Sequence, residues 1–419
     1  MFDDCALSWS ATQGRPNQRE TNHGYDVNLP IRAEVISELE RLESLVEAWD
    51  DLAVSQSRPR SAPAWVISWY RHVLPRRARP RVIVVWDGET LAGVMPLFVH
   101  RDPLGLFKYQ LAGTRTLYGV EPLVQPGAFE DVSAVLGVAL ASVVPRPDIV
   151  ELDCMVDVRP WLHGVATQWP RRDPEVADRT SRAYLTKLGD GFEPWLESTT
   201  PMFRKNLRRG RRDLGMEDLR PAVHLDAQSV IERLPALARQ YESRKDARGG
   251  EGMKFDDRVC AMISDAVTRL SGSGRVCLAT WEKPGTIAVA DLAMGAGREL
   301  SAWVRGFDPA VARASPGIVN LATLFEHAAG AGYSVVDLGP GEEPYKLRFA
   351  NSERDLQRTV LSGRNRWPLH SPVQLLSLAH RHALVDRLRR STVRIRRGEI
   401  VPRPELSLRR LSTCAPSLM

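Results

Sequence analysis

The segment from Gly339 to Lys346 (GPGEEPYK) gathers groups that exchange protons within eight residues. It contains two carboxylates, a phenol and an amine, and its glycines and prolines indicate a bent loop. Such a loop can hold the carboxylate of Glu342 or Glu343 half-buried and raise its pKa, which makes either a candidate general base. Lys346 could contact a phosphate or a substrate carboxylate. The alternative for Glu342 and Glu343 is that they are ordinary solvated acids. The alternative for Lys346 is a structural ion pair with Asp337.

A second candidate acid lies upstream, in a segment predicted to be buried. Asp291 interrupts the apolar run Ile287–Met294, which is expected to be a strand facing a core. Because a carboxylate in a core costs free energy unless it is paired, Asp291 needs either a partner or a chemical role. A salt bridge to Arg305 on the neighbouring strand is the structural alternative to catalysis.

The tripeptide Ser315-Pro316-Gly317 predicts a helix start that could bind an anion. Ser315 is a favourable N-cap, and Pro316 suits the first helical position, where its missing N–H costs nothing. The first turn of a helix has unpaired N–H groups, and a glycine there lets a pyrophosphate approach the backbone. The alternative is an ordinary helix start. The candidate cofactor-binding residues are Arg305, Arg313, Ser315, Gly317 and Ile318.

These residues are positioned by a predicted strand–helix–strand unit. Leu300–Phe307 alternates and carries Trp, Val and Phe, as strands do. The following helix is predicted from apolar residues at helical spacing and ends at Gly330 and Gly332. Ser334–Leu338 is then a short apolar strand. The loop with Tyr345 follows directly, beyond the carboxyl end of a strand, where open α/β sheets place their sites.

The order of strand, Ser-Pro-Gly helix, Asp-x-Gly strand end and Tyr-Lys resembles the GNAT-fold acyltransferases. Within them the chain is most similar to the branch grouped with cellulose-biosynthesis accessory proteins, and more distantly to the Fem-type peptidoglycan aminoacyltransferases. The resemblance extends over Glu34–Leu361 and is most specific at Ala314–Ile318 and Asp337–Lys346. One departure is that the usual phosphate loop, Gln/Arg-x-x-Gly-x-Gly/Ala, is replaced by Arg313-Ala-Ser-Pro-Gly317, which has a single glycine.

The resemblance implies acyl-CoA as a co-substrate bound at the Ser-Pro-Gly turn. It also implies that Tyr345 protonates the leaving thiolate, although a phenol that only packs is an equal alternative. The basic stretch Arg204–Arg212 would contact phosphate. The alternatives for this stretch are tRNA binding, as in the Fem-type relatives, and a solvated helix face.

The chain is predicted to have an α/β (α+β) fold with two tandem GNAT-like domains, each a central mixed sheet flanked by helices. Hairpin signals at Arg81–Val99 and Val276–Met294 occur at the same place in both halves, which suggests a duplication. A helix is expected at Glu34–Trp49, and Tyr118–Pro122 of the first copy is expected to shape the acceptor cleft. The expected divisions are a disordered leader (1–33), the two domains (34–170 and 183–362), a linker (171–182) and a basic tail (363–419).

Composition limits the other possibilities. The five cysteines among 419 residues are scattered without ligand spacing, so neither a metal nor a disulfide framework is expected. No signal-peptide pattern opens the chain, and its longest uncharged stretch, Val132–Pro145, is too short to span a bilayer, so a soluble cytoplasmic protein is predicted. Basic residues concentrate in Arg204–Arg212 and in Ala379–Arg410. The second of these segments could bind an anionic membrane or an envelope-assembly partner, or remain solvated.

Together these expectations describe an N-acyltransferase that moves an acyl group from acyl-CoA to a small-molecule amine of a sugar, an amino acid or a cell-envelope precursor. No Ser-His-Asp or Cys-His pairing stands out, so direct attack in a ternary complex is favoured over a covalent enzyme intermediate. The expected catalytic residues are Asp291, Glu343, Tyr345 and Lys346. Two alternatives remain. One is a Fem-like transferase that uses aminoacyl-tRNA, and the other is a non-catalytic accessory protein of polysaccharide (cellulose-like) biosynthesis, which the missing second glycine favours.

Overall fold

The computed structural model describes residues 31–103, 105–114, 116–156, 179–247 and 252–362. The predicted basic tail lies outside these ranges, as do residues 1–30 of the predicted leader and 171–178 of the predicted linker. No helix in the described part of the chain is long and apolar enough to cross a membrane.

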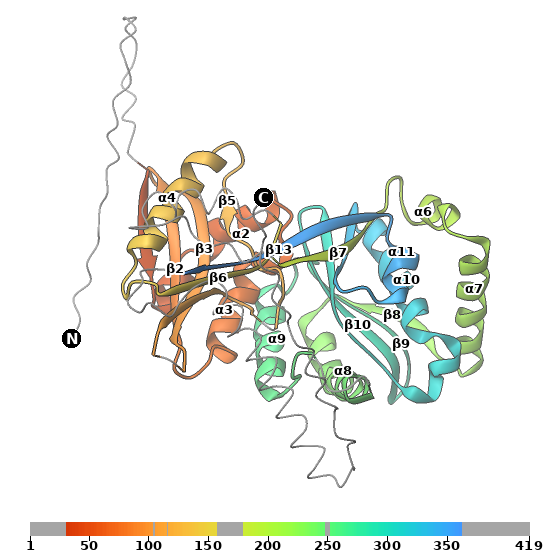
Figure 1. Cartoon of the computed structure of the whole chain (residues 1–419). Helices are drawn as coiled ribbons and strands as arrows, with labels where there is room; N and C mark the ends of the chain where they lie inside the picture. Colours follow the sequence, from red (N-terminus) through yellow and green to blue (C-terminus); the bar gives the residue numbers. More distant parts are fainter. Residues whose placement is uncertain (1–30, 104, 115, 157–178, 248–251, 363–419) are drawn as a thin grey trace, which may run out of the picture. The chain divides into compact units, whose positions relative to one another are not determined.

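Within the described residues, thirteen strands form one mixed sheet that runs through both halves (Figure 1). The strands are β1 (Arg32–Ile36), β2 (Arg79–Asp87), β3 (Thr90–Arg101), β4 (Phe107–Leu111), β5 (Leu123–Val124), β6 (Ile149–Met155), β7 (Arg179–Lys187), β8 (Arg220–His224), β9 (Val276–Lys283), β10 (Thr286–Ala296), β11 (Glu299–Phe307), β12 (Val335–Pro340) and β13 (Ser352–Ser362).

The order of the strands shows that one plan is used twice. From one edge the sheet reads β1-β2-β3-β4-β6, from the other β8-β9-β10-β11-β12, and β13 and β7 lie between these two sets. In each set the last pair is parallel, β4 with β6 and β11 with β12. Each parallel pair is joined by a crossover helix, α4 (Phe129–Ser142) or α10 (Pro316–Gly330). The two predicted hairpins are β2–β3 and β9–β10, at equivalent positions.

The sequence predicted a separate central sheet for each half, but the strands of the two halves join into a single sheet. β13 pairs with β6 of the first half as well as with β7, and β7 pairs with β12 of the second half. The last residues of the expected linker, 179–182, therefore belong to a central strand. Sequence could not indicate this, because the partners of β7 come from much later in the chain.

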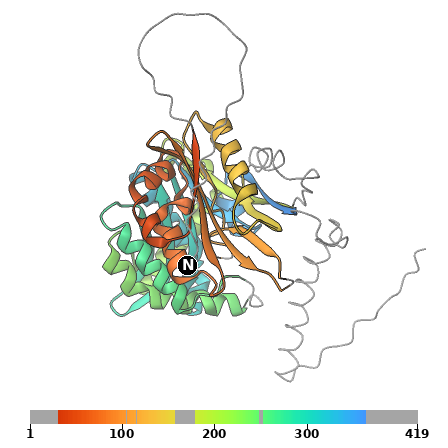
Figure 2. The same ribbon diagram turned by 90° about the vertical axis from the view of Figure 1, so that its left-hand side faces the viewer.

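Helices cover both faces of the sheet. One side, here the shared face, carries α1 (Leu39–Glu43), α2 (Val46–Ser55), η1 (Pro59–Ser61), α3 (Pro63–His72), α8 (Ala227–Ala247) and α9 (Asp257–Arg269). In the second half the other side, here the α10 face, carries α6 (Phe192–Ser198), α7 (Pro201–Met216), η2 (Pro309–Ala314), α10 and α11 (Pro344–Phe349). In the first half, α4 lies across the strands from α1–α3 (Figure 2).

The core on the shared face belongs to both halves. Trp49 and Trp65 from the first half are in one buried cluster with Met262 and Val304 from the second. The rings of Trp65 and Trp303 meet edge to face, with centroids 5.6 Å apart. Burial of such large side chains supplies much of the free energy of folding, so the two halves stabilise each other.

The predicted helix at Glu34–Trp49 is wrong at its start and right only from Leu39 onward, with an interruption at Ser44 and Leu45. Residues from Arg32 to Ile36 form β1 and pair antiparallel with β2, and the helical part is divided between α1 and α2. Ile36 is buried whereas Val35 is 40% exposed, which is the alternation of a half-buried strand. A neighbouring strand therefore overrides the local helical pattern.

Candidate functional site

β11 and β12 separate after a short paired segment and leave a V-shaped opening in the hydrogen-bonded sheet, here called the V. This opening determines where the candidate site lies. The two strands pair only where Glu299–Ser301 meets Val335–Asp337. Beyond that point β11 continues beside β10 to Phe307, whereas β12 stays with β7, its partner from Val335 onward, as far as Pro340. Because the strands separate, the edge of β11 after Ser301 is left without β12 as a neighbour.

A β-bulge in β11 determines which side chains face α10. Leu292 is opposite Val304 and Ala293 is opposite Ala302, so Trp303 is an extra residue in the register. A bulge reverses the alternation of side chains beyond it. In a regular strand Arg305 would point to the same face as Trp303, which is the shared face. With the bulge, Arg305 instead projects from the same face as Ala302, toward α10.

The bulge brings Arg305 opposite Asp291 of β10, with which it forms a buried ion pair. Asp291 is only 2% exposed, and its other oxygen accepts a hydrogen bond from Asn320 Nδ2 of α10 at 2.7 Å. This is the salt bridge that sequence offered as the alternative to catalysis. Since both carboxylate oxygens are engaged, Asp291 fixes the position of Arg305 and is not free to accept a substrate proton.

Arg305 also contacts the two other parts of the predicted site. Its guanidinium carbon lies 4.7 Å from the ring centroid of Tyr345. A Cβ placed on Gly317 would lie 3.4 Å from Arg305 Cδ and 3.9 Å from Nη1. The phenol and the start of α10 therefore lie on one face of the sheet, around one guanidinium. Burial raises the pKa of Tyr345, so the phenol keeps its proton at neutral pH and can donate it.

The start of α10 is open on its outer side. Ser315 is exposed, and its backbone oxygen accepts from the amides of Ile318 and Val319. The expectation that Ser315 caps the helix is wrong, because its φ is 53° and its side chain makes no capping hydrogen bond. On the inner side α7 approaches so closely that a Cβ on Gly210 would lie 2.6 Å from Ala314 O.

Of the two crossover helices, α10 has the start that is better suited to an anion. The first turn of α10 contains no acid, whereas the first turn of α4 contains Glu130 and Asp131. Acidic side chains already stabilise that end of α4 and repel a phosphate.

Lys346 holds the loop after β12 in place. Its ammonium group lies 2.9 Å from Glu343 Oε2 and donates to the carbonyl oxygens of Gly339, at 3.3 Å, and Pro340. The expected partner Asp337 lies instead 3.9 Å from Arg60 of η1. Lys346 is 4% exposed, and burial lowers its pKa. With Glu343 and two carbonyls as partners, Lys346 orders the loop.

The last three predicted residues, Arg313, Ile318 and Glu343, differ in their surroundings. Arg313 is exposed on η2, and Ile318 packs against the core of the α10 face. Glu343 lies near enough to act electrostatically on both Arg305 and Tyr345. The structure thus gathers six predicted residues, namely Asp291, Arg305, Gly317, Glu343, Tyr345 and Lys346.

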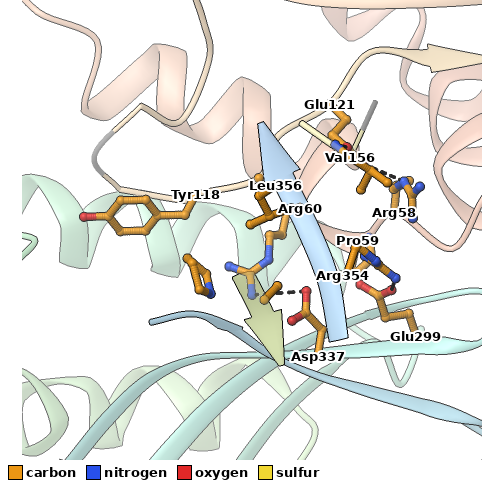
Figure 3. A pocket seen from close by; sticks show the side chains of 13 residues that line it. Arg58, Pro59, Arg60, Tyr118, Glu121, Val156, Glu299, Asp337, Arg354 and Leu356 are labelled. Carbon is orange, nitrogen blue, oxygen red and sulfur yellow. Dashed lines mark hydrogen bonds and ion pairs between the residues drawn. The ribbon is translucent and has the colours of Figure 1, made fainter. Parts of the chain in front are cut away.

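On the shared face, the V opens toward a polar hole between the two halves (Figure 3). Its volume of about 30 Å³ has room for water only. The loop residues Tyr118, Gly119 and Glu121, in the segment expected to shape an acceptor cleft, line it. Three ion pairs surround it: Arg58 with Glu121 at 2.7 Å, Arg60 with Asp337 at 3.9 Å and Arg354 with Glu299 at 3.1 Å.

Sequence reasoning missed Glu299 and Arg60. Burial, and then the nearby charge of Asp337, raise the pKa of Glu299, which is 6% exposed. The signal that identified Asp291 is absent here, because Glu299 is the first residue of β11 and follows Gly297 and Arg298. Arg60 donates to the carbonyl oxygens of Leu117 at 2.9 Å and Ala302 at 3.3 Å and so lies in the V itself. No sequence signal could identify Arg60, because its partners lie in other elements.

Comparison with known proteins agrees with this geometry. Residues 202–347, which include α7, the V and most of α11, match the family described as the acetyltransferase (GNAT) domain. The chain carries a GNAT domain. No curated protein matches the chain.

One solved structure supports the same fold for the GNAT domain and the half that precedes it, and two more are similar to the chain. The C-terminal domain of a putative lysylphosphatidylglycerol synthetase from Agrobacterium fabrum is 13% identical, with a TM-score of 0.50, and covers 77% of this chain and 93% of that one. FemX is 11% identical with a TM-score of 0.49, covering 78% of this chain and 96% of that one. A tandem GNAT protein from the clavulanic acid biosynthesis pathway is 13% identical with a TM-score of 0.41, covering 79% and 98%. At such identities the likeness concerns the fold alone. The family match and the strand order repeated in the two halves confirm the predicted tandem GNAT fold. The closer relation to cellulose-biosynthesis accessory proteins stays a prediction.

Proposed function

We propose that this GNAT protein is an N-acyltransferase that uses acyl-CoA and transfers the acyl group directly to an amine. The observation that carries the proposal is the arrangement around Arg305. A proton-bearing phenol, Tyr345, and an acid-free helix start at Gly317 both lie beside the Arg305 side chain, next to an open V in the sheet.

The donor would bind through its pyrophosphate at the start of α10. Free N–H groups in the first turn of a helix favour an anion. In α10, Pro316 has no N–H, and Ile318 and Val319 donate to Ser315 O, so the Gly317 amide is the group that would bind the phosphate. Arg305 bonds Asp291 through Nε, and its Nη1 lies on the side of Gly317. A phosphate oxygen at the Gly317 amide would therefore also be within reach of a positive charge.

Direct transfer requires two proton movements. As the amine nitrogen bonds to the thioester carbon, the C–S bond breaks, and the leaving thiolate takes a proton from Tyr345. The amine loses a proton to a base. Glu343 was the expected base, but it is held by Lys346. Glu299 is the candidate on the acceptor side, because it lines the hole on the shared face and its raised pKa favours proton uptake. Its two oxygens are held by Arg354 and Ser301, so an arriving amine would have to displace one of these partners.

The acceptor would approach from the shared face, where the first half contributes Arg58, Arg60 and the loop at Tyr118. We propose a small-molecule amine on a sugar, an amino acid or a cell-envelope precursor, modified in the cytoplasm. The hole has room for water only, so entry of the acceptor must displace the loop or an ion pair around it.

Calorimetric titration tests the proposal. Acetyl-CoA, a longer acyl-CoA and aminoacylated tRNA are titrated separately into the full chain. Saturable binding of one acyl-CoA, weakened in Arg305→Met and unchanged in Arg313→Met, would support it. Binding of the charged tRNA alone would replace it with the Fem-like transferase, and binding of none of the three would replace it with the accessory protein.

A further inference from the structure

Helix α7 has a strongly basic side that the donor site does not use. Its buried residues, Phe203, Leu207, Gly210 and Leu214, follow one stripe at helical spacing. Gly210 contacts η2 and the start of α10, so this stripe is the side that faces the donor site. Figure 1 shows α7 at the margin of the second half, with α10 and α11 on its inner side.

The basic residues of α7 divide into two groups. Two of them are used in the fold: Arg204 donates to the carbonyl oxygens of Glu197 and Thr199, and Arg211 pairs with Glu326 of α10 at 2.9 Å. The other four are exposed on the side opposite the stripe, here called the outer basic face, which consists of Lys205, Arg208, Arg209 and Arg212.

The outer basic face is only weakly neutralised. The single acid of α7 is Asp213, which lies at 3.4 Å from Arg209 and 3.8 Å from Arg212. Such exposed pairs contribute little free energy. Lys205 and Arg208 are not involved in these pairs. Four adjacent cations pointing away from the sheet make a surface complementary to a polyanion.

Large apolar side chains accompany these cations. Met202 and Met216, near the two ends of α7, are 62% and 72% exposed. Leu347 of α11 is 56% exposed, and α11 adjoins the first turn of α7 through the rings of Phe349 and Phe203, 5.1 Å apart. Exposed methionines gain free energy by entering the apolar edge of a bilayer. Nucleic acids instead favour aromatic side chains on which bases stack, and the only aromatic residue of α7 is buried.

We propose that the outer basic face of α7 docks the protein onto an anionic lipid surface. The cations would lie at the headgroups, and Met202 and Met216 would enter the interface. Because the opposite side of α7 contacts the start of α10, docking would place the donor site next to the bilayer. The inference stands on the surface of α7 and does not require the proposed acyl transfer.

Co-sedimentation of the full chain with vesicles tests the inference. The vesicles contain phosphatidylglycerol and phosphatidylcholine, or phosphatidylcholine alone. We expect binding to the mixed vesicles only, decreasing with added salt. Each Lys or Arg near an anionic surface contributes about a fivefold increase in binding, so Lys205→Ala/Arg208→Ala should bind about 25-fold more weakly. The matched control is Arg76→Ala/Arg77→Ala, which removes two exposed cations of the first half and should bind like the unmodified chain.

A second variant separates a lipid surface from other polyanions. Met202→Ser/Met216→Ser should weaken vesicle binding and leave any binding of tRNA unchanged. Equal vesicle binding by the unmodified chain and Lys205→Ala/Arg208→Ala would overturn the inference and assign the binding to another basic segment. If Lys205→Ala/Arg208→Ala lost tRNA binding and kept vesicle binding, the inference would be overturned in favour of a nucleic-acid surface.

Discussion

Replacing Gly317 by alanine should separate donor binding from folding. The glycine is in the first turn of α10, and its φ lies outside the left-handed region. A Cβ there would find Arg305 Cδ as its nearest neighbour, at 3.4 Å, which is an ordinary van der Waals contact. The fold should therefore accept alanine. Alanine is favoured over glycine in helices by up to about 1 kcal/mol, so the free energy of unfolding should stay the same or rise slightly.

The same Cβ would occupy the space through which a phosphate approaches the backbone. Loss of one hydrogen bond from a backbone N–H to a charged oxygen costs roughly 1.5–3 kcal/mol. That corresponds to a dissociation constant for acetyl-CoA increased roughly 10- to 150-fold. Calorimetric titration measures the affinity, and urea denaturation measures the stability.

A matched glycine and a truncated donor serve as controls. Gly330 is the last residue of the same helix, and a Cβ there has no neighbour within 4 Å, so Gly330→Ala should leave the affinity unchanged. S-acetylpantetheine lacks the pyrophosphate and should bind Gly317→Ala as it binds the unmodified chain. An equal loss of affinity for both donors, or no loss for acetyl-CoA, would refute the assignment of the phosphate to this turn.

Three further predictions concern the groups around the V. Tyr345→Phe keeps the ring over Arg305, so acetyl-CoA affinity should persist while kcat falls about 10²- to 10⁴-fold in steady-state assays; an unchanged kcat would exclude the phenol as the proton donor. Asp291→Ala leaves Arg305 buried without its partner and should lower the free energy of unfolding in urea by about 3 kcal/mol, and a loss below about 1 kcal/mol would contradict the ion-pair role. Because the pKa of Glu299 is raised in the folded protein, the folded state binds more protons at Glu299 than the unfolded state does. The contribution of Glu299 to the free energy of unfolding therefore falls as pH rises from the ordinary glutamate pKa through the pKa in the folded protein. In urea titrations at successive pH values, Glu299→Gln should remove this decrease in the free energy of unfolding. The same variant should remove the acid limb of the pH profile of kcat/KM, and persistence of both effects would place the titrating group elsewhere.

Short-range chemistry explains what the sequence predicted about the site. The spacing of apolar residues, Pro316 at the first position and the glycines near the end determine α10, because these preferences act within a few residues. The turn residues between β2 and β3 and between β9 and β10 likewise determine both hairpins. Asp291 was recognisable as a residue that needs a partner, since an acid in an apolar strand is costly wherever the strand packs.

Tertiary structure decided the rest, because those features depend on residues distant in sequence. β1 is a strand only because β2 is available beside it. The bulge at Trp303, which turns Arg305 toward α10, is visible only in the register of β10 against β11. Arg60 reaches the V from the first half because the two halves share one core. Local preferences set the elements and the residue types, whereas the pairing of distant strands set which side chains meet.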